Sequence, residues 1–344
     1  MALTAEQIAD LVKAVDPDKG RDRWTNIATT LQQYIAMKRL TKDGRVQRYT
    51  GRGVQENVMV DDLGTARNVG LYATDVVAVK DIMATLSIPF RHTTGNWSID
   101  RRELSMDQGS PQKIYDLLLS RKVGARISLA KRMEIDFWAA PLNDDTTPFG
   151  VQYWIVKDPT TTPDGAFNGG NPSGFSGGAG SIDSATFTAW KNWTGGYANV
   201  TKDDLVRKMR KAYTFIEFEP PVESPDYYSG MDYEIFCNYN VRGKLEEVGE
   251  NQNENLGRDI ASMDGVTTFR AAPLVWVPQL ETDTTDPVFF INWKNFAIVV
   301  LEDEFLVETS LPPQHPQHTV LRNHLDLSWN TRAHNRRNLA VISK

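Results

Sequence analysis

The chain has 344 residues, of which 40% are hydrophobic and 24% charged, enough apolar material for one large domain or two ordinary ones. No apolar run approaches the ~20 residues that span a bilayer, and the first residues lack the pattern of a secretory signal, so we expect no membrane partner. The single cysteine, Cys237, excludes a disulfide within the chain and suits a reducing cytoplasm.

The net charge of -6 is unevenly distributed along the chain. Residues 1–140 carry 21 Lys and Arg against 17 Asp and Glu, a net of +4, whereas the remaining residues carry 17 against 27, a net of -10. Two interpretations stay open: ordinary scatter, or an N-terminal part that faces a polyanion while the C-terminal part faces solvent. So small a basic excess would support only weak, sequence-independent contact with nucleic acid.

The first third of the chain predicts two helices and then a projecting hairpin. Apolar residues recur at helical spacing over 4–14 and 23–38. From 43 to 108, glycines interrupt extended segments, of which 84–91 and 97–104 have the composition of strands. Few core-forming residues occur near the start of this region. Because an isolated hairpin is marginal in water, this one needs a neighbouring molecule to lie on.

The clearest helix is expected at 110–138, where Ser110 suits the N-cap and Pro111 the first helical position. At ~1.5 Å per residue, this helix would be on the order of 40 Å long. One stripe along it is apolar. Another stripe is basic and includes Arg121, Lys122, Arg126, Lys131 and Arg132.

The remainder of the chain predicts a long loop and then mixed helices and strands. Residues 143–196 are rich in Gly, Pro, Ser, Thr and Asp, which is typical of a surface loop or insertion. Helices are expected at 201–216 and 241–256, and strands at 233–238, at 269–278 and in several segments between 287 and 342.

The sequence contains no pattern that demands catalysis or metal binding. The glycine run at 169–180 lacks the Gly-Lys-Ser/Thr ending of a phosphate loop and does not join a strand to a helix, so it favours a flexible surface loop. Four of the five histidines lie between 315 and 334, but in a loop and in strand positions that do not converge as metal ligands. We therefore expect no catalytic residue, no metal and no cofactor.

Acidic clusters at 61–62, 144–145 and 302–304 could supply the carboxylates of a glycoside hydrolase, and nine tryptophans could form a sugar platform. Each cluster lies in a predicted hairpin or turn, where carboxylates are usually solvated, and the aromatic residues follow core periodicity. Cys237 lies in a strand pattern without a neighbouring base, which favours an inert buried thiol.

Three segments resemble the major capsid proteins of tailed bacteriophages, which have the Hong Kong 97-type fold. They are APLVWVP at 272–278, DPVFFINW at 286–293 and NRRNLAVI at 335–342. The order of elements resembles that family over nearly the whole chain. The resemblance implies an α+β fold with an N-terminal arm at 1–42, an extended loop at 43–108, a peripheral domain with the spine helix at 109–141 and 286–344, and an axial domain at 142–285 that contains the insertion 143–196.

The function implied by this resemblance is structural and not enzymatic. Many copies would form hexamers and pentamers in an icosahedral virion shell, assembled in the host cytoplasm around double-stranded DNA that is bound without sequence preference. Besides itself, the chain would have a portal and a possible decoration protein as partners. Because only residues 1–42 precede the hairpin, the scaffolding protein is expected to be separate.

Specific residues follow from this hypothesis. The spine-helix cations would face the interior, and Trp293 and Trp329 would be core residues. Lys80 is the only lysine of the predicted hairpin, and the expected tip at 50–62 has none, so we predict no isopeptide cross-link. Arg336 and Arg337 could equally contact neighbours or stay solvated. The residues expected at subunit contacts are Arg45, Arg48, Arg52, Asp61, Asp62, Arg101 and Arg102.

Two alternatives belong to other classes. An encapsulin-type nanocompartment would use the same fold to enclose a protein cargo instead of DNA. A soluble carbohydrate-active protein would be monomeric and would use tryptophans such as Trp190 and Trp193 to bind glycans.

Overall fold

The structure is a computed structural model that describes residues 34–40, 45–71, 79–106, 111–217, 232–250, 260–263, 266–313 and 318–344. The helix predicted at 4–14 lies outside these residues, as does most of the one predicted at 23–38, whose described end is helix α2 (Ile35–Leu40). No helix in these ranges is both long and apolar enough to cross a membrane.

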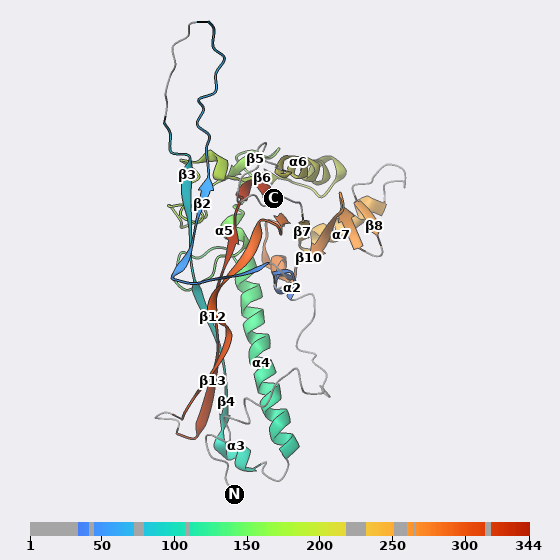
Figure 1. Ribbon diagram of the computed structural model, residues 1–344. Coiled ribbons are helices and arrows are strands. Elements are labelled where there is room, and N and C mark those ends of the chain that lie inside the picture. The colour runs from blue at the N-terminus through green and yellow to red at the C-terminus, as the bar shows by residue number, and fades with distance from the viewer. Residues whose placement is uncertain are drawn as a thin grey trace.

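A long four-stranded sheet forms one half of the molecule, with helix α4 (Pro111–Trp138) lying along it (Figure 1). The strand order is β1-β12-β13-β4. Buried side chains of α4, such as Leu118, Leu129 and Phe137, face the core on this side. The strands are β1 (Val46–Tyr49), β4 (Arg91–Asp100), β12 (Phe296–Leu311) and β13 (Val320–Ala333).

An eight-stranded sheet forms the other half, in the order β5-β6-β14-β11-β7-β10-β9-β8. Strands β6, β14, β7 and β10 run in one direction, since β6 and β14 are parallel, β7 and β10 are parallel, and β11 is antiparallel to both β14 and β7. The strands are β5 (Ala166–Gly169), β6 (Asn192–Gly196), β7 (Tyr233–Cys237), β8 (Ile260–Met263), β9 (Val266–Phe269), β10 (Ala272–Trp276), β11 (Val288–Asn292) and β14 (Ala340–Ser343).

Helices α6 (Arg207–Ile216) and α7 (Tyr239–Glu250) flank this second sheet (Figure 1). The prediction of a helix at 201–216 is confirmed: it begins with a π-helical turn at Lys202–Val206, whose N-cap Thr201 accepts a hydrogen bond from the backbone N–H of Asp204 at 3.3 Å. The predicted strand at 269–278 is interrupted, because Arg270 and Ala271 adopt positive φ and form a tight turn between β9 and β10.

A narrow hairpin projects beyond both sheets (Figure 1). Its strands are β2 (Gly53–Met59) and β3 (Met83–Pro89), and the connection between them runs from 60 to 82. The predicted strand 84–91 is confirmed in β3, but the tip expected at 50–62 is wrong, because 53–59 pairs with 83–89. The longer hairpin expected from 43 to 108 is also wrong: β1 and β4 pair with β12 and β13 in the four-stranded sheet.

The strand predicted at 97–104 ends at Asp100, where a short helix begins. The carboxylate of Asp100 accepts the backbone N–H of Arg102 at 2.9 Å, which caps helix α3 (Arg101–Met106). Asp100 is therefore a helix N-cap, and this local signal was overlooked because the preceding residues have the pattern of a strand.

The expectation of a flexible surface loop at 169–180, and of a surface insertion at 143–196, is wrong for most of this segment. It contributes helix α5 (Val151–Trp154), strands β5 and β6, and buried residues including Trp154 and Trp190. Gly180 has a φ of +64°, and a Cβ atom there would lie 2.1 Å from the side chain of Leu86. Glycine serves here as a close-packing residue.

A fully buried arginine attaches this insertion to the C-terminal strands. Arg336 was expected to contact neighbours or solvent, and it does neither, since its exposed fraction is 0%. Burial lowers the pKa of its guanidinium to about 9, so that the group remains charged at neutral pH. Five oxygens accept its hydrogen bonds: the carbonyls of Trp154 (2.8 Å), Trp190 (3.0 Å), Gly169 (3.4 Å) and Gly170 (2.9 Å), and the side-chain amide of Asn192 (3.0 Å).

A buried carboxylate attaches α2 to the long helix α4. Glu134 accepts hydrogen bonds from the backbone N–H groups of Ala36 (3.0 Å) and Met37 (2.9 Å) and from the indole of Trp138 (2.8 Å). Burial raises the pKa of this carboxyl, and the backbone donors act in the opposite direction. The free backbone N–H groups at the start of α2 thus bond to the carboxylate of Glu134, 98 positions away, whose negative charge also suits a helix N-terminus.

We predict that Arg336→Met destabilises the protein by more than about 3 kcal/mol, because each buried acceptor left without a donor costs about 1–3 kcal/mol. Arg337→Met is the matched control, since Arg337 is only partly buried and lies over the Phe167 ring. The control should cost about 1 kcal/mol or less. Chemical denaturation of the two variants measures the difference, and equal losses would contradict the role given to Arg336.

A second prediction concerns Trp293, which is 2% exposed and packs against Phe137, Phe236 and Phe296. Trp293→Ala should destabilise the protein by ~3–5 kcal/mol, as large-to-small changes at buried aromatic positions do. A thermal melt that is unchanged by this substitution would show that the surrounding rings do not depend on Trp293.

Candidate subunit interface

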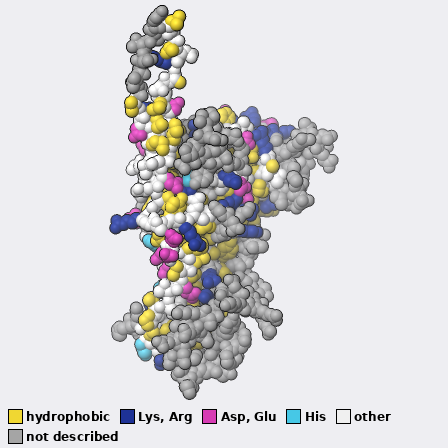
Figure 2. Space-filling model, in the orientation of Figure 1, with side chains coloured by type: hydrophobic (Ala, Val, Ile, Leu, Met, Phe, Trp, Pro, Cys, Tyr) yellow, Lys and Arg dark blue, Asp and Glu magenta, His cyan; other side chains and the backbone are white. Residues whose placement is uncertain are grey.

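The projecting hairpin exposes apolar side chains that its own chain does not cover. Leu71 and Val79 are each 94% exposed, and Met59, Leu63, Val69 and Met83 are all at least 45% exposed. Figure 2 shows hydrophobic side chains along the length of this projection, beyond the body of the molecule. Several large apolar side chains exposed along one projection indicate a surface that another molecule covers.

The base of the hairpin is held by a charged network. Arg332 on β13 is fully buried and pairs with Glu56 on β2, and it also donates to Tyr49 and Gln47 on β1. His334 approaches the second oxygen of Glu56 at 3.2 Å. Arg332 lies 276 positions from Glu56, so no local sequence pattern indicated that these residues meet.

A backbone ladder continues this anchor toward the tip. Ser87 of β3 donates its N–H to the carbonyl of Gly180 at 2.9 Å, which joins the hairpin to the insertion. Beyond the last strand pair, Val60 N–H bonds the Ile82 carbonyl at 3.0 Å, and Asp61 forms an ion pair with Lys80. The hairpin is therefore fixed at its base and along its first part.

The residues predicted at subunit contacts do not form one cluster. Arg45 makes its contacts within its own chain: it pairs with Asp232, and its guanidinium lies 4.9 Å from the ring centre of Trp293. Asp61 pairs with Lys80, and Arg102 bonds Asp100 and Thr319 at longer range. The other four residues predicted at subunit contacts are exposed and have no side-chain partner in the described part of the chain: Arg48, Arg52, Asp62 and Arg101.

The basic stripe predicted on the spine helix is partly neutralised. Lys122 is buried and pairs with Glu308 at 2.9 Å. Arg121 forms two hydrogen bonds with Glu103, at 2.8 and 3.1 Å, and Arg132 pairs with Asp136 at 2.9 Å. The remaining two residues, Arg126 and Lys131, are exposed and have no ion pair within the described ranges.

The tryptophans that the structure describes do not form a sugar platform. Trp190 and Trp193 are each 3% exposed, and Trp293 and Trp329 also lie in the core. Among the eight tryptophans in the described ranges, only Trp276 is partly exposed. The carbohydrate-binding alternative therefore lacks the surface on which it was based.

The other candidate sites from the sequence also lack the features of a catalytic or metal site in the described residues. Burial raises the pKa of the Cys237 thiol to about 12, so the thiolate is scarce at neutral pH. Within the described residues, no group of three or more His, Cys, Asp or Glu side chains is placed to hold a metal ion, and His315 lies outside these residues. Asp144 caps its own loop by accepting the N–H of Thr147 at 2.7 Å.

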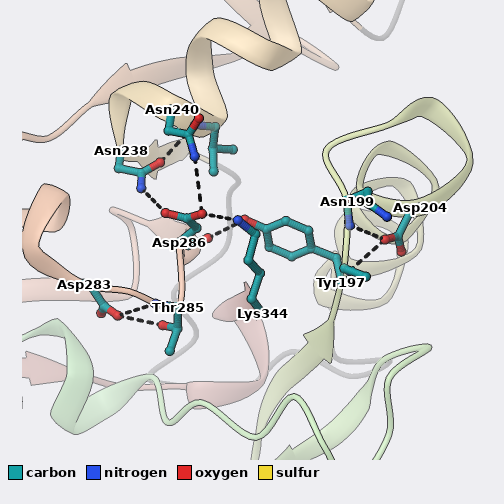
Figure 3. Close-up of polar contacts among 11 residues, drawn as sticks. Tyr197, Asn199, Asp204, Asn238, Asn240, Asp283, Thr285, Asp286 and Lys344 are labelled. Atoms are coloured by element: carbon teal, nitrogen blue, oxygen red, sulfur yellow. Dashed lines mark hydrogen bonds and ion pairs between the residues drawn. The ribbon is translucent and has the colours of Figure 1, made fainter.

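A polar cluster lies where parallel strands of the eight-stranded sheet end (Figure 3). The Tyr197 hydroxyl donates to the carbonyl of Asp286 at 2.7 Å. The Asp286 carboxylate accepts from Asn238 and from Asn240 (3.5 Å) and pairs with Lys344. Burial, and then the charge of Asp286, raise the pKa of Tyr197. The cluster ties the ends of β6, β7 and β14 to the start of β11, which makes it a structural joint.

No model of a known protein family matches the sequence, and no curated protein matches it. Solved structures do match. The capsid asymmetric unit of cyanophage A-1(L) has a TM-score of 0.59 at 13% identity, over 94% of this chain and 96% of that chain. The capsid of the native GTA particle has a TM-score of 0.52 at 10% identity, over 99% of each chain. This chain has the Hong Kong 97-type capsid fold.

The prediction of an α+β, Hong Kong 97-type fold is thereby confirmed. The same fold is found in the SrpI encapsulin of Synechococcus elongatus PCC 7942, with a TM-score of 0.53 at 9% identity over 100% of this chain and 96% of that one. Phage capsids and an encapsulin thus share this architecture. The fold is one that forms shells, and it does not by itself distinguish a DNA cargo from a protein cargo.

Our third prediction is that the attachment of the hairpin to the body weakens in acid, because it depends on the ionised carboxylate of Glu56. Burial raises the pKa of Glu56, but the hydrogen bond from His334 and the charge of Arg332 outweigh it, and the pKa lies below the ordinary 4.5. A lowered carboxyl pKa adds stability that is present above the unfolded-state value and lost as the pH falls through the folded one. We therefore expect the protection factors of the β2 and β3 amides, which are corrected for the intrinsic slowing of exchange in acid, to fall below pH 4.5.

Glu56→Gln should show low protection factors already at neutral pH, and these should lose most of their dependence on pH. Glu302→Gln, an exposed carboxylate on β12, is the control and should behave as wild type. Equal protection of β2 and β3 in wild type and Glu56→Gln would rule out the anchor.

Proposed function

We propose that this chain is a major capsid protein that assembles as hexamers and pentamers into an icosahedral virion shell around double-stranded DNA. The observation that carries the proposal is the projecting hairpin, with an anchored base and an uncovered apolar connection. A second copy of the chain supplies the cover. Burial of apolar area, at about 25 cal/mol per Å², then stabilises the contact.

The domain division expected from the resemblance is part of this proposal. Residues 1–42 act as the arm, and the peripheral and axial parts correspond to the four-stranded and eight-stranded sheets. Strands β11 and β14 come from 286–344 but lie in the eight-stranded sheet, which links the two parts firmly. Of the 43–108 segment, residues 53–89 form the hairpin that reaches the neighbour.

The other partners follow from the same proposal. Arg126 and Lys131 are the spine-helix cations available to contact packaged DNA, because the other three predicted there are ion-paired within the chain. A separate scaffolding protein directs assembly in the host cytoplasm, a portal occupies one vertex, and a decoration protein can bind the outside. Arg48, Arg52, Asp62 and Arg101 remain available for charged contacts between subunits.

Removing the hairpin connection is the direct test. A variant in which 62–79 is replaced by a short Gly-Ser turn keeps the Asp61–Lys80 pair and both hairpin strands. It should fold with an unchanged melting temperature, because none of the described residues that it removes is buried, but it should form no closed shells. Negative-stain microscopy after expression with the scaffolding protein measures the outcome.

A length-matched control replaces the same residues with an equal number of Gly and Ser residues. It preserves the reach of the connection but removes its apolar side chains, so it should also fail to close shells. Normal particles from either variant would contradict the role given to this surface.

A nanocompartment shell is the second candidate, and the likeness to the SrpI encapsulin favours keeping it. Both candidates predict particles, so the contents decide between them. Purified particles that contain nuclease-protected DNA support the virion shell. Particles that contain a stoichiometric protein and no nucleic acid support the nanocompartment.

A further inference from the structure

Two aromatic rings and a carboxylate form a small open cage at the carboxyl ends of β7 and β10, which are neighbouring strands of the eight-stranded sheet. Tyr239 begins α7 and is 68% exposed, and Trp276 ends β10 (Figure 1 locates both elements). Their ring centres lie 6.4 Å apart with an interplanar angle of 77°. Glu281 lies in the short helix that follows β10 and is hydrogen-bonded to both residues.

Glu281 is held in place through one of its two carboxylate oxygens. Oε1 accepts the indole N–H of Trp276 at 2.5 Å and the backbone N–H of Tyr239 at 2.6 Å. The second oxygen, Oε2, has no partner among the described residues, and the side chain is exposed. The carboxylate is therefore oriented by the two aromatic residues and still able to accept from an outside donor.

The setting of Trp276 is unlike that of the other tryptophans. The other seven in the described ranges are less than 9% exposed and pack in the core, whereas Trp276 keeps part of its ring in solvent although its N–H is already satisfied. Exposing large rings is unfavourable unless something covers them. Trp and Tyr are also the residues that most often dominate protein–protein contacts.

The chemistry of the cage selects a cation. Ring faces attract an ammonium or guanidinium group, and an oriented carboxylate oxygen adds a charge-assisted hydrogen bond. No cation of the described chain pairs with Glu281. Arg48, Arg52 and Arg101 are exposed and without a side-chain partner, so a second copy of the chain has cations to offer.

We propose that the Tyr239–Trp276–Glu281 cage receives an arginine or lysine side chain from a second copy of this chain when the shell forms. The inference rests on the proposed shell function and names a contact within it that is separate from the hairpin. It assigns Trp276 and Glu281 to subunit association.

The first test compares assembly of full-length variants. Trp276→Ala and Glu281→Gln should each raise the protein concentration needed for half-assembly by at least about fivefold, the loss expected on truncating a moderate hot-spot residue. Glu281→Lys should raise it further, because like charges then meet. Trp276→Phe keeps a ring but loses the N–H that holds Glu281, so it should lie between wild type and Trp276→Ala. Light scattering against protein concentration gives the values.

Matched controls separate the cage from general surface effects. Phe215→Ala removes another exposed aromatic ring, and Glu247→Gln removes another exposed carboxylate on α7. Both should assemble as wild type does. Circular dichroism confirms folding of every variant, and Trp276→Phe and Glu281→Gln remain informative if Trp276→Ala does not fold.

Acrylamide quenching gives an independent readout. The contribution of Trp276 is the difference in quenchable fluorescence between wild type and Trp276→Phe. This contribution should be quenched by acrylamide in free subunits and protected from it in particles. Unchanged quenching on assembly, or half-assembly concentrations within twofold of wild type for both Trp276→Ala and Glu281→Gln, would overturn the cage.

The proposed function and the cage can fail separately. Wild-type protein that forms no particles with its scaffold would refute the shell, and the cage is then tested with N-acetyl-arginine amide against N-acetyl-citrulline amide. A change in Trp276 fluorescence that saturates with the arginine compound, and not with its neutral analogue, supports a cation site. Equal responses to the two compounds would refute it.

Discussion

The burial of Arg336 is the constraint on which much of this molecule depends. Its guanidinium is removed from water without a carboxylate partner, so the cost of desolvation is offset only if every surrounding carbonyl is in position at once. Those carbonyls come from residues 154–190, which have little regular structure of their own. Through these hydrogen bonds, Arg336 holds the glycine-rich segment in one conformation against the C-terminal strands.

The projecting hairpin is built on that segment. Gly180 receives the N–H of Ser87 and packs against Leu86, so the insertion supports one hairpin strand, while Arg332 holds Glu56 on the other. A projection attached through both strands points in a direction set by the body. In a shell, where each subunit must reach the same place on the next, this preset direction reduces the conformational entropy lost on association.

Local patterns in the sequence predicted the parts whose signals are local. The long helix after Ser110 and the dense β-branched strands near the C-terminus have short-range periodicity, and they carried the resemblance to phage capsid proteins. The insertion was mistaken for a flexible loop because glycine suits both mobile chain and close packing. The anchors were missed because their partners are backbone carbonyls, as at Arg336, or lie 276 positions away, as at Glu56.

In the proposed shell, the need to stay in solution before assembly limits how subunits can adhere. A large apolar patch on the body would associate without order, but here the exposed apolar side chains are spread along a narrow hairpin. Charged residues flank them, with the Asp61–Lys80 pair at the start of the connection, and such flanking charges oppose edge-to-edge aggregation. Exposed charge pairs between subunits would add only about 0–1 kcal/mol each, so a single subunit contact would gain little beyond its limited apolar area. A closed shell gains its stability because every copy makes the same contacts, and weak contacts let misplaced copies leave before closure.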